Sequence, residues 1–103
     1  MYKPDKWLIV KVNSDTPHYR VFGSWGGGYT TGDEWRLNSG ITKVSEDGDY
    51  YLFEGSSGSV YRCHKKMYGS TGYGWSVITG MQKEQPLFEI LDESVDVTKL
   101  EYK

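Results

Sequence analysis

Residues 35–66 read WRLNSGITKVSEDGDYYLFEGSSGSVYRCHKK, and they decide the fold because apolar and polar residues alternate between three turn signals. Asn38-Ser39-Gly40 suits a three-residue hairpin loop with glycine in a left-handed conformation. Asp47-Gly48 is a strong hairpin signal, and Gly55-Ser56-Ser57-Gly58 favours a third reversal. The stretch therefore predicts a four-stranded antiparallel meander, with strands at residues 34–37, 41–45, 50–54 and 59–66.

The length of the loop at Asp47-Gly48 decides which side chains of the meander face inward. A two-residue loop places six residues on one face as a core, namely Trp35, Leu37, Ile41, Leu52, Tyr61 and Cys63. The opposite face then mixes rings with cations, including Arg36, Tyr51, Phe53, Arg62 and His64. A three-residue loop that includes Glu46 would shift the third and fourth strands by one residue and exchange their faces. Both registers are compatible with the sequence.

Composition supports a single β domain over residues 1–103. The chain has no alanine, while glycine, tyrosine, tryptophan and serine are abundant, so helix propensity is low and β propensity high. A chain of this length buries roughly 65% of its unfolded surface, which is enough for one core without disulfides. Aromatic residues make up 16% of the chain. Since a small core needs fewer rings, we expect some of them at the surface.

The flanking segments add more strands. Residues 6–12 predict a strand buried on both faces, paired as a hairpin with residues 18–25, where Tyr19 and Val21 face one side and His18 and Arg20 the other. Residues 75–81 and 87–91 predict two further strands, and residues 93–103 fit a short strand, a helical turn or a frayed tail. With seven or eight strands, we expect an all-β fold, either a small antiparallel barrel or a two-sheet sandwich with a central meander.

Charge and cysteine content indicate in which cellular compartment the protein acts and which classes of partner it can bind. One cysteine, no leader and no apolar run near 20 residues favour a cytoplasmic protein that does not enter a membrane. The net charge is −2, and six acidic residues face one lysine between residues 84 and 101. Because only the stretch at residues 61–66 is basic, we do not expect duplex nucleic acid as a partner.

The residues that could act in catalysis are not expected to lie together in one site. Cys63 and His64 are adjacent on a predicted strand, so their side chains point to opposite faces, and a buried structural cysteine is the simpler interpretation. Two histidines and one cysteine match no zinc pattern. We therefore expect no catalytic residues, no metal and no cofactor.

Glycine, serine and aromatic residues coincide in the predicted loops, a composition typical of binding surfaces. Rings supply contact area, small polar residues adapt their hydrogen bonds, and arginines offer bidentate contacts to phosphate or carboxylate. We predict a non-enzymatic binding module for a small polar, nucleotide-like or phosphorylated ligand. Its candidate ligand-binding residues are Trp25, Gly27, Tyr29, Arg36, Asn38, Ser39, Ser57 and Arg62. Trp7 and Trp35, in contrast, are predicted core residues.

A second hypothesis has a different partner. The aromatic surface and the acidic C-terminal segment could dock on another protein, as an interaction or inhibitor module. Exposed edge strands would also allow a homodimer.

The segments SWGGGYTTGDEWRLNSGI and YYLFEGSSGSVYRCHKK resemble small uncharacterised proteins of large bacteriophages. The resemblance covers about the middle half of the chain. It implies an accessory protein that acts by stoichiometric binding, for instance by sequestering a nucleotide signal or blocking a host protein. It implies no particular site residues.

Overall fold

The computed structural model describes residues 1–27 and 32–102, and this part of the chain forms seven strands, one α-helix and one 3-10 turn. In chain order they are β1 (Lys6–Val12), β2 (His18–Trp25), β3 (Glu34–Leu37), β4 (Ile41–Asp47), β5 (Tyr50–Gly55), β6 (Val60–His64), α2 (Gly72–Glu84), β7 (Phe88–Ile90) and η1 (Val97–Lys99). The predicted antiparallel β fold is confirmed as two separate sheets rather than a closed barrel.

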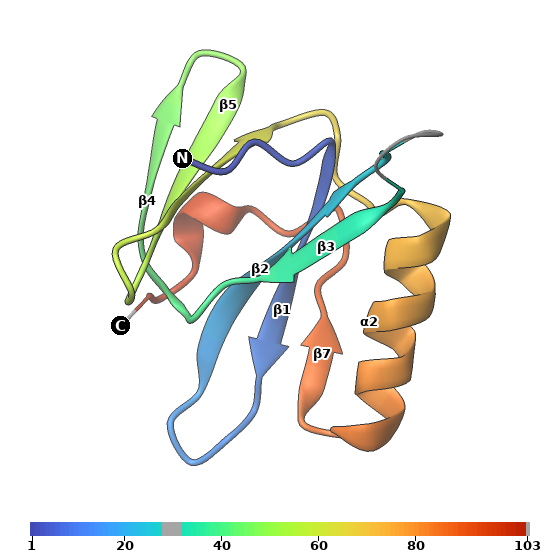
Figure 1. Ribbon diagram of the computed structural model, residues 1–103. Helices are drawn as coiled ribbons and strands as arrows, with labels where there is room; N and C mark the ends of the chain where they lie inside the picture. The colour runs from blue at the N-terminus through green and yellow to red at the C-terminus, as the bar shows by residue number, and fades with distance from the viewer. Residues whose placement is uncertain (28–31, 103) are drawn as a thin grey trace.

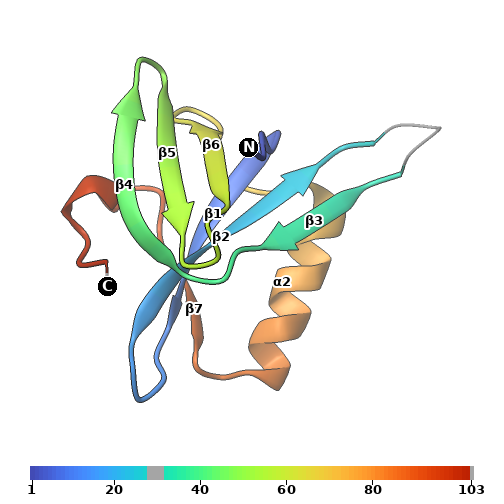
Figure 2. The ribbon, with the colours of Figure 1, turned by 60° about the vertical axis from the view of Figure 1, so that its left-hand side comes forward.

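The elements stack in three layers (Figures 1 and 2). The middle layer is an antiparallel sheet in the order β3-β2-β1-β7. The sheet β4-β5-β6 packs on one of its faces, and α2 lies against the other.

The central position of β1 follows from its sequence, KWLIVKV, which is apolar on both faces. Trp7 and Ile9 point into the core between the two sheets, where they meet Val21, Ile41, Phe53, Tyr61, Cys63 and Val97. Leu8 and Val10 point the other way and pack with Phe22 and Ile78 beneath the helix. The prediction that this strand is buried on both faces is confirmed.

The prediction of a four-stranded meander is wrong in one connection. β3 pairs with β2, not with β4, so Asn38-Ser39-Gly40 is a corner between two sheets rather than a hairpin. Asn38 explains the divergence, because its backbone N–H donates to the Val21 carbonyl (2.9 Å) and its side-chain Oδ1 accepts from the Val21 N–H (2.8 Å). These bonds hold Asn38 against β2, and Gly40, at φ 135°, then turns the chain into the second sheet.

The meander β4-β5-β6 is present, with a register that differs from both predicted alternatives. Asp47 pairs with Tyr50, so the loop has two residues, Gly48 and Asp49. A β-bulge between Ile41 and Lys43 turns Ile41 and Val44 to the same side of the sheet. The next reversal is one residue longer than predicted, because Glu54 pairs with Val60. Consequently Phe53, not Leu52, shares the core face with Tyr61 and Cys63.

The predicted strand at residues 75–81 is wrong, because these residues belong to α2. Thr71 caps the helix by accepting a hydrogen bond from the Gly74 N–H (3.0 Å), and Ile78 is fully buried against the sheet. Packing on the apolar face of β1 and β2 therefore overrides the low helix propensity of the segment.

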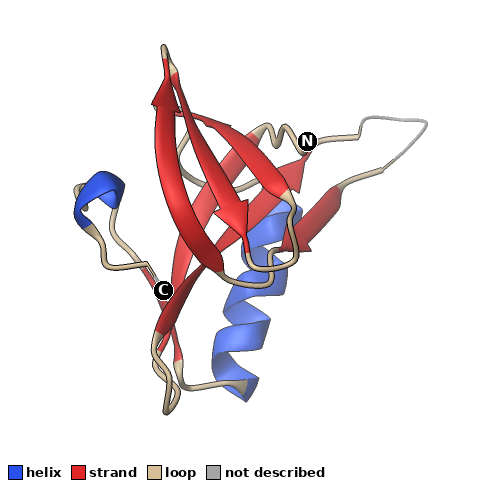
Figure 3. Ribbon diagram, turned by 90° about the vertical axis from the view of Figure 1, so that its left-hand side faces the viewer, coloured by secondary structure: helices blue, strands red, loops and turns tan. Residues whose placement is uncertain are grey.

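One further expectation about packing differs in the structure, and the C-terminal segment adopts one of its predicted alternatives, a helical turn. Trp35 lies on the edge strand β3, 37% exposed and stacked on Phe22, whereas Trp7 is buried as predicted. The C-terminal segment forms the turn η1, capped by Asp96, and packs beside β4 (Figure 3). Val97 is buried in the core between the sheets, and Tyr102 packs against that core.

Candidate functional site

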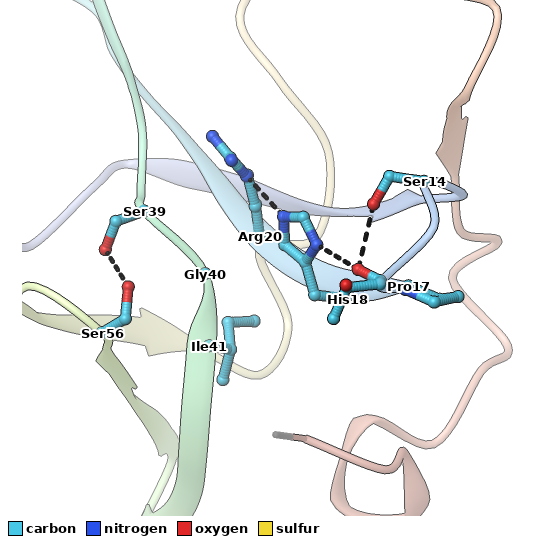
Figure 4. Close-up of a pocket in the computed structure, with 9 residues that line it drawn as sticks. Ser14, Pro17, His18, Arg20, Ser39, Gly40, Ile41 and Ser56 are labelled. Atoms are coloured by element: carbon cyan, nitrogen blue, oxygen red, sulfur yellow. Dashed lines mark hydrogen bonds between the residues drawn. The ribbon is translucent and has the colours of Figure 1, made fainter.

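A polar pocket of about 360 Å³ lies where the chain crosses from β3 to β4. The turn after β1 and the first residues of β2 form one side, and the β3–β4 corner with Ser56 forms the other (Figure 4). We call this the polar pocket, and its lining residues are Ser14, Thr16, Pro17, His18, Arg20, Ser39, Gly40, Ile41 and Ser56. Its volume falls within the range of small-molecule sites in proteins.

His18 orients Arg20 within this pocket (Figure 4). The Thr16 carbonyl, which can only accept, lies 3.0 Å from His18 Nδ1, so Nδ1 carries the proton. The other ring nitrogen, Nε2, then accepts from Arg20 Nε at 3.0 Å. The two residues reach each other because alternate residues of a strand share a face. The Arg20 guanidinium is thus held through Nε, which leaves both terminal nitrogens for other partners.

Hydroxyl groups form the opposite side of the pocket. Ser56 Oγ donates to Ser39 Oγ at 2.9 Å, and the Ser57 backbone N–H donates to the same oxygen at 3.1 Å. The Ser56 backbone N–H is bonded to the Gly40 carbonyl (2.8 Å), which fixes the reversal before β6 against the corner. In this view the two hydroxyls point toward each other, on the side of the pocket opposite Arg20 and His18 (Figure 4).

The charge of the polar pocket is positive. Arg20 is the single charged residue among those that line it, and no carboxylate does. Within residues 1–27 and 32–102, the ion pairs join Lys43 to Glu54 and Lys65 to Glu46, so Arg20 is not neutralised by an acidic partner. A half-buried guanidinium beside several hydroxyls suits an oxyanion such as phosphate or carboxylate.

The structure brings three of the predicted site residues to this region. Ser39 lines the pocket, and the Ser57 backbone N–H donates to the Ser39 hydroxyl oxygen. Asn38 is 4% exposed and serves the corner rather than the pocket surface, since its Oδ1 is bonded to Val21.

Trp25 and Gly27, two of the predicted site residues, lie away from the polar pocket. Trp25 ends β2, seven residues beyond His18, which corresponds to about 23 Å along an extended strand. Its indole N–H donates to the Lys3 carbonyl at 2.9 Å. The Gly27 backbone N–H, near the same end, is bonded to Asp33 (3.3 Å). The predicted residue Tyr29 lies outside the described residues.

The two predicted arginines are also apart from the pocket and from each other. Arg36 on β3 lies over the ring of Tyr2, with its guanidinium carbon 4.5 Å from the ring centroid. Arg62 on β6 lies 3.8 Å from the centroid of Tyr50, on the outer face of the three-stranded sheet. Both guanidinium groups therefore make cation–π contacts within the fold.

Sequence reasoning did not select His18 and Arg20 as site residues. It did place them on one face of the predicted strand, so the i, i+2 spacing was the available signal. What the sequence lacks is the tertiary pairing of Asn38 with Val21, which brings Ser39 and Gly40 beside them.

The only cysteine is confirmed as a buried structural residue. Cys63 is fully buried, and burial raises the pKa of its thiol well above the usual range. His64, the next residue, faces the outer side of the sheet against Tyr50. In the described ranges, no cluster of three His, Cys, Asp or Glu side chains could hold a metal ion.

Comparisons with protein-family models, curated proteins and solved structures find no match. The resemblance to bacteriophage proteins therefore stays a prediction. Among the residues that the structure describes, no helix has the length and apolar character needed to cross a membrane.

Proposed function

We propose that this protein is a binding module for a small molecule that carries a phosphate or carboxylate group, held in the polar pocket. The observation that carries the proposal is the Arg20 guanidinium, which His18 orients and which no carboxylate neutralises among the lining residues. The terminal nitrogens would bind the oxyanion as a bidentate pair, and the Ser39 hydroxyl, which accepts from Ser56 and Ser57, would donate its own hydrogen to a remaining oxygen.

The arrangement of the rings favours a phosphorylated or carboxylated ligand over one recognised by base stacking. The imidazole of His18 is the single aromatic ring among the lining side chains, and it is engaged by Thr16 and Arg20. Trp25 lies at the far end of β2. A stoichiometric binder of this kind agrees with the accessory role that the resemblance to bacteriophage proteins implies.

Thermal unfolding with and without oxyanions tests the proposal. Inorganic phosphate, a sugar phosphate, a nucleoside monophosphate and a dicarboxylate are compared at matched ionic strength. At a hundredfold excess over its Kd, a ligand raises the free energy of unfolding by about 2.7 kcal/mol. We expect at least one of these compounds to stabilise the wild-type protein and to lose this effect on Arg20→Gln.

Arg62→Gln is the matched control, because it removes the same charge from a half-buried arginine outside the polar pocket. It should respond to the ligand as the wild type does. Equal stabilisation of Arg20→Gln and Arg62→Gln would show that the anion acts through general charge, and no stabilisation by any of the four compounds would also reject the proposal.

A further inference from the structure

The strand β3 has one edge that pairs with nothing in the described part of the chain. It is the outer strand of the four-stranded sheet, and β2 is its neighbour on the inner side (Figure 2). Glu34, Trp35 and Arg36, its first three residues, are all exposed. An exposed strand edge can accept a further strand through main-chain hydrogen bonds.

The backbone groups of Trp35 and Leu37 point away from β2. The Asn38 N–H donates to the Val21 carbonyl, so these two residues occupy a hydrogen-bonded position of the ladder. Such positions alternate along an antiparallel pair, so Arg36 also directs its backbone groups toward β2. The N–H and C=O groups of Trp35 and Leu37 therefore form the outer edge of the sheet.

The other outer strands of the two sheets are obstructed within the molecule. At β7 the Phe88 N–H donates to the Gln85 carbonyl (3.0 Å), and the Phe88 carbonyl accepts from Gln82 Nε2 (3.4 Å). The backbone of Tyr2 pairs with the outer edge of β6. A β-bulge interrupts β4, and η1 packs beside it. Within the described ranges, β3 thus has the least obstructed edge.

The charges on β3 distinguish between the ways in which two copies of this strand could pair. Main-chain hydrogen bonds require that outward-facing residues lie opposite each other, so the pair can be centred on Glu34, Trp35 or Arg36. The first register places two carboxylates opposite each other, and the last places two guanidinium groups opposite each other. The register centred on Trp35 places Glu34 of each copy opposite Arg36 of the other, and opposite charges stabilise such cross-strand pairs.

The side chains of β3 are available for this pairing. Glu34 and Arg36 share a face of the sheet, and among the described residues neither takes part in an ion pair. The contact of Arg36 with the ring of Tyr2 orients its guanidinium without neutralising it. Trp35 lies on the other face, 37% exposed beside Phe22, where it would meet the same indole of the second copy. Tryptophan is enriched in protein interfaces.

We infer that β3 pairs antiparallel with β3 of a second copy of this chain, around a two-fold axis centred on Trp35. The two four-stranded sheets then form one continuous sheet of eight strands. The partner is a second copy because one short strand supplies both members of each ion pair, in the order that two-fold symmetry requires. This inference does not depend on the ligand of the polar pocket, so either can fail without the other.

Charge reversal tests both the surface and the register. Sedimentation velocity over a series of protein concentrations should show a reversible dimer for the wild type. Glu34→Arg would place arginines opposite each other at two symmetric positions, and Arg36→Glu would do the same with glutamates. Each variant should raise the Kd of the dimer by about tenfold or more. An equimolar mixture of the two variants should form a heterodimer about as tight as the wild-type dimer, because opposite charges face each other again.

Glu89→Arg is the matched control, because it reverses the same charge on an exposed residue at the other edge of the same sheet. It should dimerise as the wild type does. The reciprocal variant Glu34→Arg/Arg36→Glu keeps the complementary pattern and should also dimerise, and thermal unfolding checks that each variant is folded. In the wild type, the amide protons of Trp35 and Leu37 should exchange with solvent more slowly as the protein concentration rises.

Three results would overturn the inference: no dimer at protein concentrations up to about 1 mM, equal weakening by Glu89→Arg, or a mixture of the two folded variants that stays monomeric. Loss of the dimer in only one of the two charge-reversal variants would also overturn it, because that result indicates a register centred on Glu34 or on Arg36.

Discussion

Asn38 shows how one side chain decides the path of the chain. It supplies both a donor and an acceptor to Val21, so it extends the pairing of β2 and β3 by one residue before the chain leaves the sheet. The Asn38 side chain is buried, and its Nδ2 has no partner within the described residues. It was predicted as a ligand-binding residue, and its observed contacts are those of a structural residue.

Replacing Asn38 by alanine should therefore destabilise the protein. The substitution leaves the buried Val21 N–H without an acceptor, which costs about 1 to 2 kcal/mol of unfolding free energy. Urea unfolding measures the change. Asn13→Ala, which removes an exposed contact to Glu89, serves as the control and should stay within about 0.5 kcal/mol of the wild type. Equal stability of the two variants would contradict the role assigned to Asn38.

Among the elements, the strands β1, β2 and β3 have the bounds that alternation predicts, because the apolar pattern of a strand is local to its sequence. Partner choice is not local, and that is why the hairpin at Asn38 was wrong. The helix α2 was missed for a related reason. Its glycines and β-branched residues favour other structures, but Thr71 caps it, and Val77, Ile78 and Met81 recur at helical spacing toward the sheet.

Two glycines of α2 should respond to alanine in opposite directions. At Gly74 an added Cβ would collide with the Ser70 hydroxyl and lie 3.1 Å from the Ser24 Cβ, so Gly74→Ala should cost about 2 kcal/mol. At Gly80 no atom lies within 4 Å of the added carbon, so Gly80→Ala should stabilise by about 0.5 to 1 kcal/mol through helix propensity. Thermal unfolding of both variants provides the measurement. A stabilising effect of Gly74→Ala would contradict the close packing of α2 on β2.

At the scale of the whole molecule, burial of tyrosines links stability to alkaline pH. Burial raises the pKa of Tyr61 and of Tyr68 from 10.0 to about 12. For Tyr61 the charge of Arg36 partly offsets this rise. Between pH 10 and 12 the unfolded chain has thus already lost protons that the folded protein keeps. The free energy of unfolding should therefore fall as the pH rises through this range, on the order of 2 kcal/mol for the buried Tyr61.

Urea unfolding across this pH range checks the prediction. Tyr61→Phe should flatten the decline, because phenylalanine has no proton to lose, whereas replacement of the 48% exposed Tyr73 should leave the profile unchanged. A wild-type stability that rises between pH 10 and 12 would contradict the assignment.

The layered architecture explains how much of the site could be foreseen. Ser39 and Ser57 were predicted as site residues because serines in turns adapt their hydrogen bonds to ligands. Ser39 lines the polar pocket, and Ser57 donates its backbone N–H to Ser39. Arg36 and Arg62 were predicted as site residues for their charge, but their guanidinium groups make cation–π contacts with neighbouring tyrosines. Arg20 was not predicted as a site residue. Its position beside the β3–β4 corner depends on contacts between segments that are distant in the sequence.

The most direct test of the polar pocket is an NMR titration of the wild-type protein with inorganic phosphate at constant ionic strength. We predict saturable shifts at the Arg20 side-chain Nε–H and at the backbone amides of His18, Ser39, Gly40 and Ser56, all abolished in Arg20→Gln. Shifts that centre instead on Arg36 or Arg62, or that persist in Arg20→Gln, would contradict the account.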